Sequence, residues 1–250
     1  MPRRASTTRK DPYFTKQQLE EEANCLLHKY GEEHEPVVQP PVPIDDIVEL
    51  HLRLTFEFKD MQSLFGVADV HGALWVNDRI VGVDQSLDPH ENPAMLGRYH
   101  FTLAHEVGHW QLHRHLYQSR ANQLSLLPEA EDRAEYVCRS SDKSPLEWQA
   151  NYFAAALLMP PEMVRSVWRE LHGELDPIYL EDLDKNRDSI LNEEIQRRGG
   201  YTVPEDRIPN VLLEHAALPL AETFQVSAEA MRIRLEELGL LKRKKENLLF

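Results

Sequence analysis

The sequence predicts an α+β protein in which a small antiparallel sheet lies beside a histidine-bearing helix, with further helices at both ends of the chain. Alternating apolar and polar residues at 52–58 are typical of a half-buried strand. Two short apolar runs, at 73–76 and 79–83, are separated by only two residues, which indicates a tight hairpin. Helical periodicity resumes near Arg98 and dominates the rest of the chain.

Composition and charge restrict the classes of function. The chain has 250 residues, 42% of them hydrophobic, which is enough to bury a core in one main domain. Its formal net charge of -14 argues against a protein whose main task is to bind a nucleic-acid backbone. No apolar run is long enough to span a membrane, and none follows the basic start as in a secretory signal. Because Cys25 and Cys138 lie far apart, no disulfide framework is expected, and we expect a cytoplasmic protein.

Helix boundaries divide the chain into segments. A helix is predicted over 15–30, with Gly31 expected to end it. Another is predicted over 145–159, after the N-cap residue Ser144 and before two consecutive prolines, while 119–143 is interpreted as a polar insert. We therefore expect a tail, helix and proline-rich linker at 1–43, a main domain at 44–171, a charged surface excursion at 172–208 and a C-terminal helical segment at 209–250.

The stretch 100–115 reads HFTLAHEVGHWQLHRH and contains the pattern HExxH. His105 and His109 are four residues apart, so on a helix both imidazoles leave the same face and can bind one ion. Glu106 lies between them, where it can act as general base toward a water at the ion. The surrounding helix is apolar, and a buried helix that carries two histidines and a carboxylate needs a chemical reason. These residues predict a catalytic zinc centre.

A catalytic zinc needs a third protein ligand, and His115 is the first candidate. It stands ten residues after His105, a spacing that suits a third histidine if a glycine turns the chain back toward the ion. Leu112 occupies the position of that glycine and favours a continuing helix, which would carry His115 away. His113 and His115 are therefore expected to cover the C-terminal end of the helix instead.

Glu147 is the favoured third ligand. Small residues follow it on the same helical face, and small side chains let two helices approach closely enough for a shared metal. The competing interpretation is that Glu147 only caps its own helix together with Ser144. Glu131 and Glu135 in the insert remain alternatives, and a thiol ligand from Cys138 is a further, weaker one.

Two blocks carry a resemblance to a known family: FTLAHEVGHWQLH at 101–113 and EWQANYFAAALLMP at 147–160. Together they resemble the ImmA/IrrE family of zinc metallopeptidases, in which an FTLAHELGH-type helix precedes the pattern ExxANxFAxxLLMP. The resemblance covers about residues 44–170 and departs from the family in the length of the insert. It implies a zincin-like core whose zinc is bound by His105, His109 and Glu147, with Glu106 as catalytic base and Asn151 supporting the ligands.

The resemblance also implies a function. It is that of a cytoplasmic zinc-dependent endopeptidase that cleaves a regulatory protein, such as a repressor or an antitoxin, in a stress, phage, mobile-element or defence response. The alternative is a metal-stabilised binding module that sequesters a regulator or contacts DNA without proteolysis. Glu106 favours catalysis, because a binding module needs no carboxylate beside the open metal position. Tyr152, His172 and Tyr201 are candidate donors to the oxyanion.

The C-terminal segment LAETFQVSAEAMRIRLEELGLL resembles the end of the same family. Ser227 is a good N-cap for a helix over 228–238, and the helix before it would complete a helix-turn-helix-like pair. The only basic run nearby is short, and the whole chain is acidic. We therefore expect helices that pack on the peptidase domain and no DNA binding.

An extended substrate needs a strand with which to pair. One of the strands predicted at 52–58, 73–76 and 79–83 is expected to form an exposed edge over the cleft. Such pairing would select an extended backbone more than a particular sequence, so we expect specificity to come from other contacts.

Overall fold

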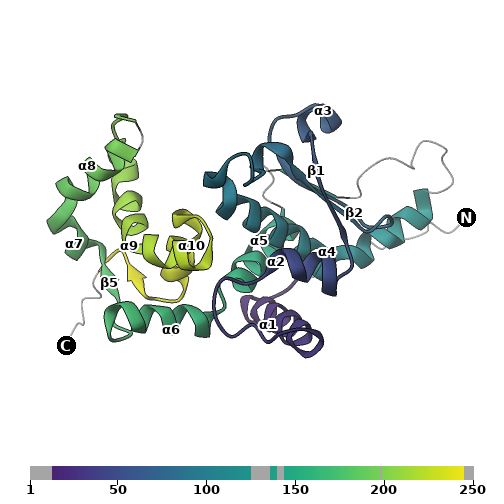
Figure 1. The fold of residues 1–250 in the computed structure, drawn as a ribbon, viewed down its shortest axis with the longest axis horizontal. Coiled ribbons are helices and arrows are strands. Elements are labelled where there is room, and N and C mark those ends of the chain that lie inside the picture. The colour runs from purple at the N-terminus through teal and green to yellow at the C-terminus, as the bar shows by residue number, and fades with distance from the viewer. Residues whose placement is uncertain (1–12, 125–135, 140–143, 198, 245–250) are drawn as a thin grey trace, which may run out of the picture.

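The computed structural model describes residues 13–124, 136–139, 144–197 and 199–244. Helices and two small sheets make up these residues, which confirms the α+β class (Figure 1). Among the described residues, no helix combines the length and apolar character that a membrane crossing requires. The elements are α1 (Lys16–Glu33), α2 (Ile44–Asp46), η1 (Ile47–His51), β1 (Thr55–Lys59), α3 (Met61–Phe65), β2 (Val70–Trp75), β3 (Ile80–Asp84), η2 (Gln85–Leu87), η3 (Pro93–Met95), α4 (Leu96–Leu124), β4 (Tyr136–Arg139), α5 (Pro145–Leu158), α6 (Pro161–His172), β5 (Ile178–Tyr179), α7 (Leu180–Leu183), η4 (Asp184–Asn186), α8 (Arg187–Arg197), η5 (Glu205–Arg207), α9 (Ile208–Phe224), α10 (Ala228–Glu237) and β6 (Leu241–Lys242).

The main sheet has the strand order β1-β3-β2-β4. The predicted hairpin is confirmed, because β2 and β3 pair antiparallel with Leu74 opposite Val81. The sheet is nevertheless mixed and not wholly antiparallel as predicted, since β1 pairs parallel with β3, Phe56 lying opposite Val81. The segment between β1 and β2, which includes α3, lets the hairpin present its second strand to β1 instead of its first.

The strand nearest the HExxH helix, β2, is not an edge of the sheet. On the side away from β3, β2 pairs antiparallel with β4, and Gly72 lies opposite Cys138. Among the described strands, the edges of this sheet are therefore β1 and β4, so one of the three predicted strands, β1, lies at an edge. The strand β4 belongs to the segment that the sequence assigned to a polar insert, where four residues in polar surroundings gave no strand signal.

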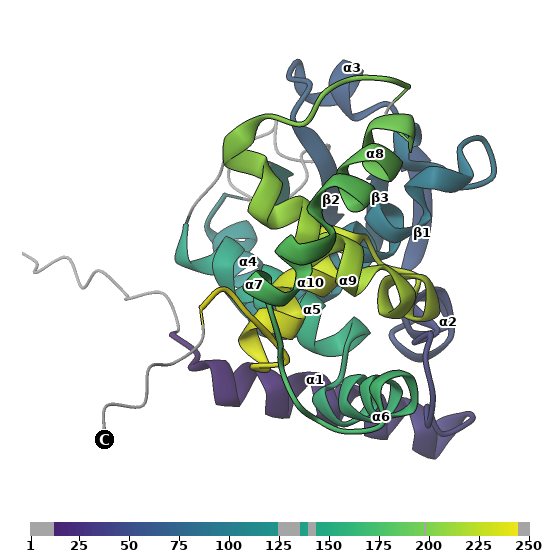
Figure 2. The same ribbon diagram turned by 90° about the vertical axis from the view of Figure 1, so that its left-hand side faces the viewer.

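Three helices are layered beneath the sheet. The helix α4 packs on one face of β2 and β3, α5 lies against α4, and α1 lies against α5 (Figures 1 and 2). The close approach of α4 to α5 depends on small residues, as expected. A Cβ added at Gly108 would lie only 3.1 Å from the Cα of Ala150, and Ala150 and Ala154 are both completely buried.

Two predicted helix ends were wrong. The helix α1 continues past Gly31 to Glu33, and Gly31 instead allows the returning chain to pass closely, since a Cβ there would lie 3.1 Å from the Cα of Pro36. The helix α4 continues to Leu124, well into the predicted insert. His113 therefore lies inside α4 and does not cover its end.

The C-terminal helices form a second group of elements, on the left of Figure 1. Residues 172–208 hold α7 and α8, whose apolar residues were too few to predict them, and Ile190 joins a small core with residues of α9. The helix α10 begins after Ser227, whose hydroxyl accepts a hydrogen bond from the Ala230 amide, so the predicted cap is confirmed.

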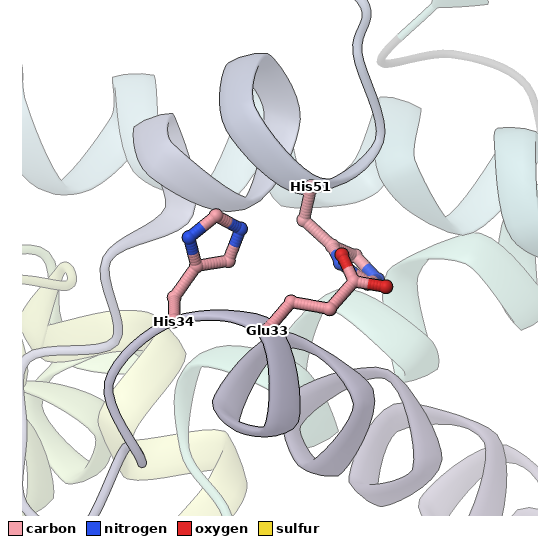
Figure 3. Close-up of side chains that lie close together, drawn as sticks. All are labelled: Glu33, His34 and His51. Carbon is pink, nitrogen blue, oxygen red and sulfur yellow. The ribbon is translucent and has the colours of Figure 1, made fainter.

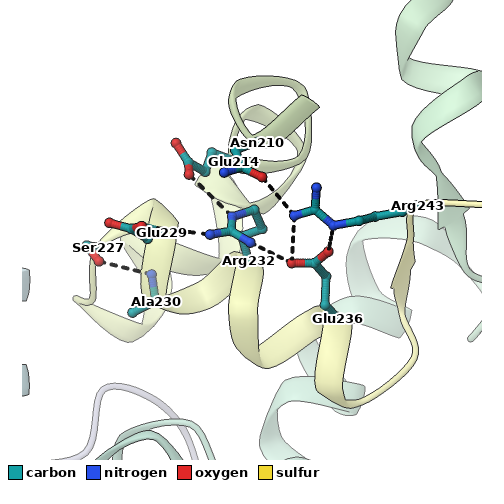
Figure 4. A network of polar contacts seen from close by, with 8 residues as sticks. All are labelled: Asn210, Glu214, Ser227, Glu229, Ala230, Arg232, Glu236 and Arg243. Carbon is teal, nitrogen blue, oxygen red and sulfur yellow. Dashed lines mark hydrogen bonds and ion pairs between the residues drawn. The ribbon is translucent and has the colours of Figure 1, made fainter. Parts of the chain in front are cut away.

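Charged side chains connect α9, α10 and the end of the chain (Figure 4). Arg232 donates to Glu214 (3.3 Å) and Glu236 (2.5 Å). Arg243 donates to Glu236 (2.6 Å) and Asn210 (2.7 Å). Arg232 is buried and Arg243 is exposed, and both guanidinium groups are paired with side chains of the same protein, which favours a structural role for the segment over phosphate binding.

A buried arginine of α10 contacts both α1 and the residue that follows α5. Arg234 of α10 is 1% exposed and forms a bidentate ion pair with Glu20 of α1, with distances of 2.6 and 2.9 Å. Its Nε also donates to the carbonyl of Met159, just after α5 (3.0 Å). Glu20 further accepts a hydrogen bond from the hydroxyl of Tyr152 (3.1 Å).

Candidate metal centre

The structure brings together three of the side chains that the sequence singled out. His105 and His109 project from α4, and Glu147 projects from the first turn of α5. All three are buried and can offer one ligand atom each to the same ion. The N-cap hydroxyl of Ser144 accepts from the Glu147 amide (3.4 Å), while the Glu147 carboxylate faces the two imidazoles. Capping therefore does not account for the position of this carboxylate.

The distances among the ligand atoms fit a single small cation. His105 Nε2 lies 3.0 Å from His109 Nε2 and 3.1 Å from Glu147 Oε2, and His109 Nε2 lies 3.6 Å from Glu147 Oε1. Ligand atoms around a tetrahedral zinc are roughly 3.3 Å apart. Two histidines and a carboxylate with a fourth position open are also the usual donor set of a catalytic zinc.

Glu106 is the most unusual group in the centre. It is completely buried, and neither of its carboxylate oxygens has a hydrogen-bond partner among the described residues. Burial, aided by the nearby charge of Glu147, raises the pKa of Glu106 to about 8. An unsatisfied buried carboxylate is costly, so it calls for a partner such as a cation with its water.

Gly72 of β2 makes room for Glu106. A Cβ at this position would lie 2.4 Å from Glu106 Oε1 and 3.0 Å from the methyl group of Thr102. Gly72 was not predicted from the sequence, although a glycine inside a strand is a recognised sign of close approach.

The two imidazoles are held differently. His105 Nδ1 donates to the Oδ1 of Asn151 (3.0 Å), one turn after Glu147 on α5, so Asn151 lies where a supporting residue was expected. His109 contacts His113, which the sequence had placed at the end of the helix. Burial lowers the pKa of His109 to about 3. Burial alone would raise the pKa of Glu147, but its hydrogen bonds with both histidines lower that pKa to about 2. The low pKa values of His109 and Glu147 favour a neutral imidazole next to an ionised carboxylate.

Other candidates from the sequence lie elsewhere. His115 is exposed on α4, which continues as a helix through Leu112. The hydroxyl of Tyr152 donates to Glu20, the ring of His172 packs at a tilt against Trp168 with centroids 4.3 Å apart, and Tyr201 is 77% exposed, so the structure places none of these three candidate oxyanion donors at the metal centre. The alternative ligands Glu131 and Glu135 and the thiol of Cys138 lie outside the residues and side chains that the structure describes.

A second group of potential ligands lies at the surface, where Glu33 and His34 at the end of α1 face His51 (Figure 3). Glu33 Oε2 is 2.9 Å from His51 Nδ1, and the Glu33 side chain is 62% exposed. The ring of His34 stacks on Tyr30. Exposed ion pairs of this kind need no metal to explain them, and they contribute at most about 1 kcal/mol to stability.

Comparison with known proteins agrees with this geometry. Residues 90–236 match the family model Peptidase_M78, described as the IrrE N-terminal-like domain. The chain belongs to this family. The match covers both ligand-bearing helices of the Peptidase_M78 domain and extends through most of α10. It confirms the resemblance inferred from the sequence and the zincin-like character of the core.

More distant comparisons add little. No curated protein matches the sequence. A solved structure of a Mycobacterium tuberculosis transcriptional regulator is similar with a TM-score of 0.42 and 12% sequence identity. The similarity covers 86% of the present chain and 46% of the regulator, so this chain spans less than half of that protein.

Proposed function

We propose that this member of the Peptidase_M78 family is a zinc-dependent endopeptidase. The observation that carries the proposal is Glu106, a fully buried carboxylate without a hydrogen-bond partner among the described residues, next to two histidines and a glutamate at ligand spacing. A binding module would gain nothing from a carboxylate held in this position. A hydrolase needs one there as a base.

The proposed mechanism divides the work among the residues of α4 and α5. His105, His109 and Glu147 would hold Zn²⁺, which supplies Lewis acidity toward the scissile carbonyl and the attacking water. Glu106 takes the proton from that water and passes it to the leaving amine. Burial raises the pKa of Glu106, which favours the protonated carboxyl that forms in the first transfer and that the second transfer requires.

A cavity beside the centre offers a place for a polypeptide. It has a volume of about 620 Å³ and lies between α4, α5 and α10. Asn151, the partner of His105, belongs to its lining, so the cavity adjoins the metal centre. Phe101, Trp148 and Ile233 give it an apolar wall. These features support a protein substrate that places a large apolar side chain next to the scissile bond.

The biological setting is also part of the proposal. We infer a cytoplasmic protease that cleaves a transcriptional repressor or an antitoxin in a stress, phage, mobile-element or defence response. Family membership and the adjoining cavity support a protein substrate. The ion pairs of Arg232 with Glu214 and of Arg243 with Glu236 support an activity that does not involve DNA.

Removal of the metal tests the proposal directly. The protein is incubated with a lysate that contains candidate substrates, and new protein N-termini are labelled and identified by mass spectrometry. We expect defined new N-termini with the zinc-loaded protein, none after treatment with a chelator, and their return when zinc is added back. Cleavage that persists in the fully chelated protein would refute a metallopeptidase.

Gly72→Ala should displace the catalytic base Glu106 without changing any metal ligand. The added Cβ would lie closer to Glu106 Oε1 than atoms can approach, so the carboxylate must move. We expect cleavage to fall about 100-fold or more while zinc content stays unchanged. Gly82→Ala in β3 is the matched control, since its Cβ would meet only the ends of the Trp75 and Met61 side chains. Equal losses in both variants would indicate general damage to the sheet.

A further inference from the structure

A chain of hydrogen bonds leads from the metal centre into the interface between α4 and α5. His109 Nδ1 lies 3.0 Å from His113 Nδ1, and His113 Nε2 lies 3.3 Å from Gln149 Oε1. All three side chains have an exposed fraction of 0%. His113 stands one helical turn after His109, and Gln149 lies two residues after Glu147. The chain thus connects the two helices that supply the ligands.

We propose that His113 and Gln149 are positioning residues that fix the hydrogen of His109 on Nδ1 and turn its Nε2 lone pair toward the metal position. The inference rests on the proposed zinc centre and assigns a role to a histidine outside the HExxH pattern.

The direction of each hydrogen bond follows from the chemistry of its atoms. The amide oxygen of Gln149 only accepts, so His113 must carry a hydrogen on Nε2. A neutral His113 then has a lone pair on Nδ1, and His109 Nδ1 must donate to it. His109 is left with its lone pair on Nε2, the atom that lies 3.0 Å from His105 Nε2.

The surroundings of His113 favour its neutral form. Its two ring nitrogens face a second imidazole and a carboxamide, and neither of these groups can balance a positive charge. Full burial makes an unbalanced charge costly. His113 therefore acts as a relay that accepts on one nitrogen and donates on the other.

The same protonation pattern appears on the other histidine of the centre. His105 Nδ1 donates to Asn151 Oδ1, which leaves the His105 Nε2 lone pair facing His109 and Glu147. Asn151 is exposed, whereas the partners of His109 are sealed from solvent. Water can replace a lost Asn151 contact, but it cannot easily replace His113. The buried relay should therefore matter more for metal affinity.

Zinc affinity tests the inference independently of cleavage. The affinity of the metal-free protein is measured by competition with a chromogenic chelator, and folding is followed by circular dichroism. We expect His113→Phe, which keeps a ring but loses both hydrogen bonds, to weaken zinc binding by about 10- to 100-fold. His113→Gln, whose amide oxygen can accept from His109, should recover most of that loss.

His100→Phe is the matched control, because His100 is another buried histidine of α4 and bonds the carbonyl of Gln225. It should leave zinc affinity nearly unchanged. Wild-type affinity in a folded His113→Phe protein, or an equal loss in His100→Phe, would overturn the inference. A wild-type protein that binds no zinc would refute the proposed centre as well.

Should His113→Phe fail to fold, NMR of the zinc-loaded wild-type protein with labelled histidines decides the matter. Long-range nitrogen–proton correlations should show the hydrogen of His109 on Nδ1 and that of His113 on Nε2. A hydrogen on Nδ1 of His113 would contradict the relay, since a purely structural contact has no reason to fix either tautomer.

Discussion

Glu106→Gln should abolish cleavage while leaving both the fold and the zinc in place. Glutamine has nearly the shape of glutamate but cannot accept a proton, so the water is no longer activated and the leaving amine receives no proton. We expect cleavage to fall by about 10²- to 10⁴-fold. The fold should tolerate the change, because burial already raises the pKa of Glu106 and so disfavours its charged form, and glutamine is an uncharged side chain of the same shape.

Three measurements on the same sample check this result: cleavage products by mass spectrometry, zinc content by metal analysis and thermal unfolding. Glu162→Gln on the exposed face of α6 serves as control and should behave as wild type. If Glu106→Gln retains full cleavage, Glu106 is not the base. If the variant instead supports the cellular response without cleavage, the result favours the alternative function, a metal-stabilised binding module.

Glu147→Ala should reduce zinc from about one ion per chain to a small fraction, because a catalytic zinc needs three protein ligands. The loss should be measured as metal content after dialysis, together with the affinity of the metal-free protein. Cleavage should disappear in parallel and should return only at high zinc concentration, if at all.

Two controls separate ligand loss from helix damage. Ser144→Ala removes the N-cap of α5 and should cost about 1 kcal/mol of stability without loss of zinc. His115→Ala, on the exposed side of α4, should also keep its zinc. Retained zinc in Glu147→Ala would move the third ligand to the segment between α4 and α5, where Glu131 and Glu135 were the alternatives.

Much of the candidate centre could be predicted because two of its proposed ligands lie close together in the sequence. A separation of four residues on one helix fixes the relative positions of His105 and His109, whatever the rest of the chain does. Glu147 required a contact between two helices, and the small residues around Ala150 made that contact foreseeable. The roles of these residues in metal binding and catalysis stay predictions that the variants above test.

The features that were not predicted from the sequence depend on contacts between residues far apart in the chain. The parallel pairing of β1 with β3 follows from how the hairpin docks, and β4 is a strand only because the edge of β2 accepts it. His113 follows the four-residue spacing after His109, but the helix was expected to end there, so its burial was not considered. The need for a glycine at position 72 arises from the position of Glu106, which lies on another element, α4.

The ion pair of Arg234 with Glu20 has a consequence for where the folding unit begins. The family match starts at residue 90, after the whole of α1. A recombinant fragment limited to that match would contain the buried guanidinium of Arg234 without its carboxylate partner. Removing one partner of a buried pair typically destabilises a protein by about 3–5 kcal/mol, a large part of the roughly 5–15 kcal/mol that holds a domain folded. We therefore expect the folding unit to begin before residue 90 and to include α1, whose Glu20 balances the buried charge of α10.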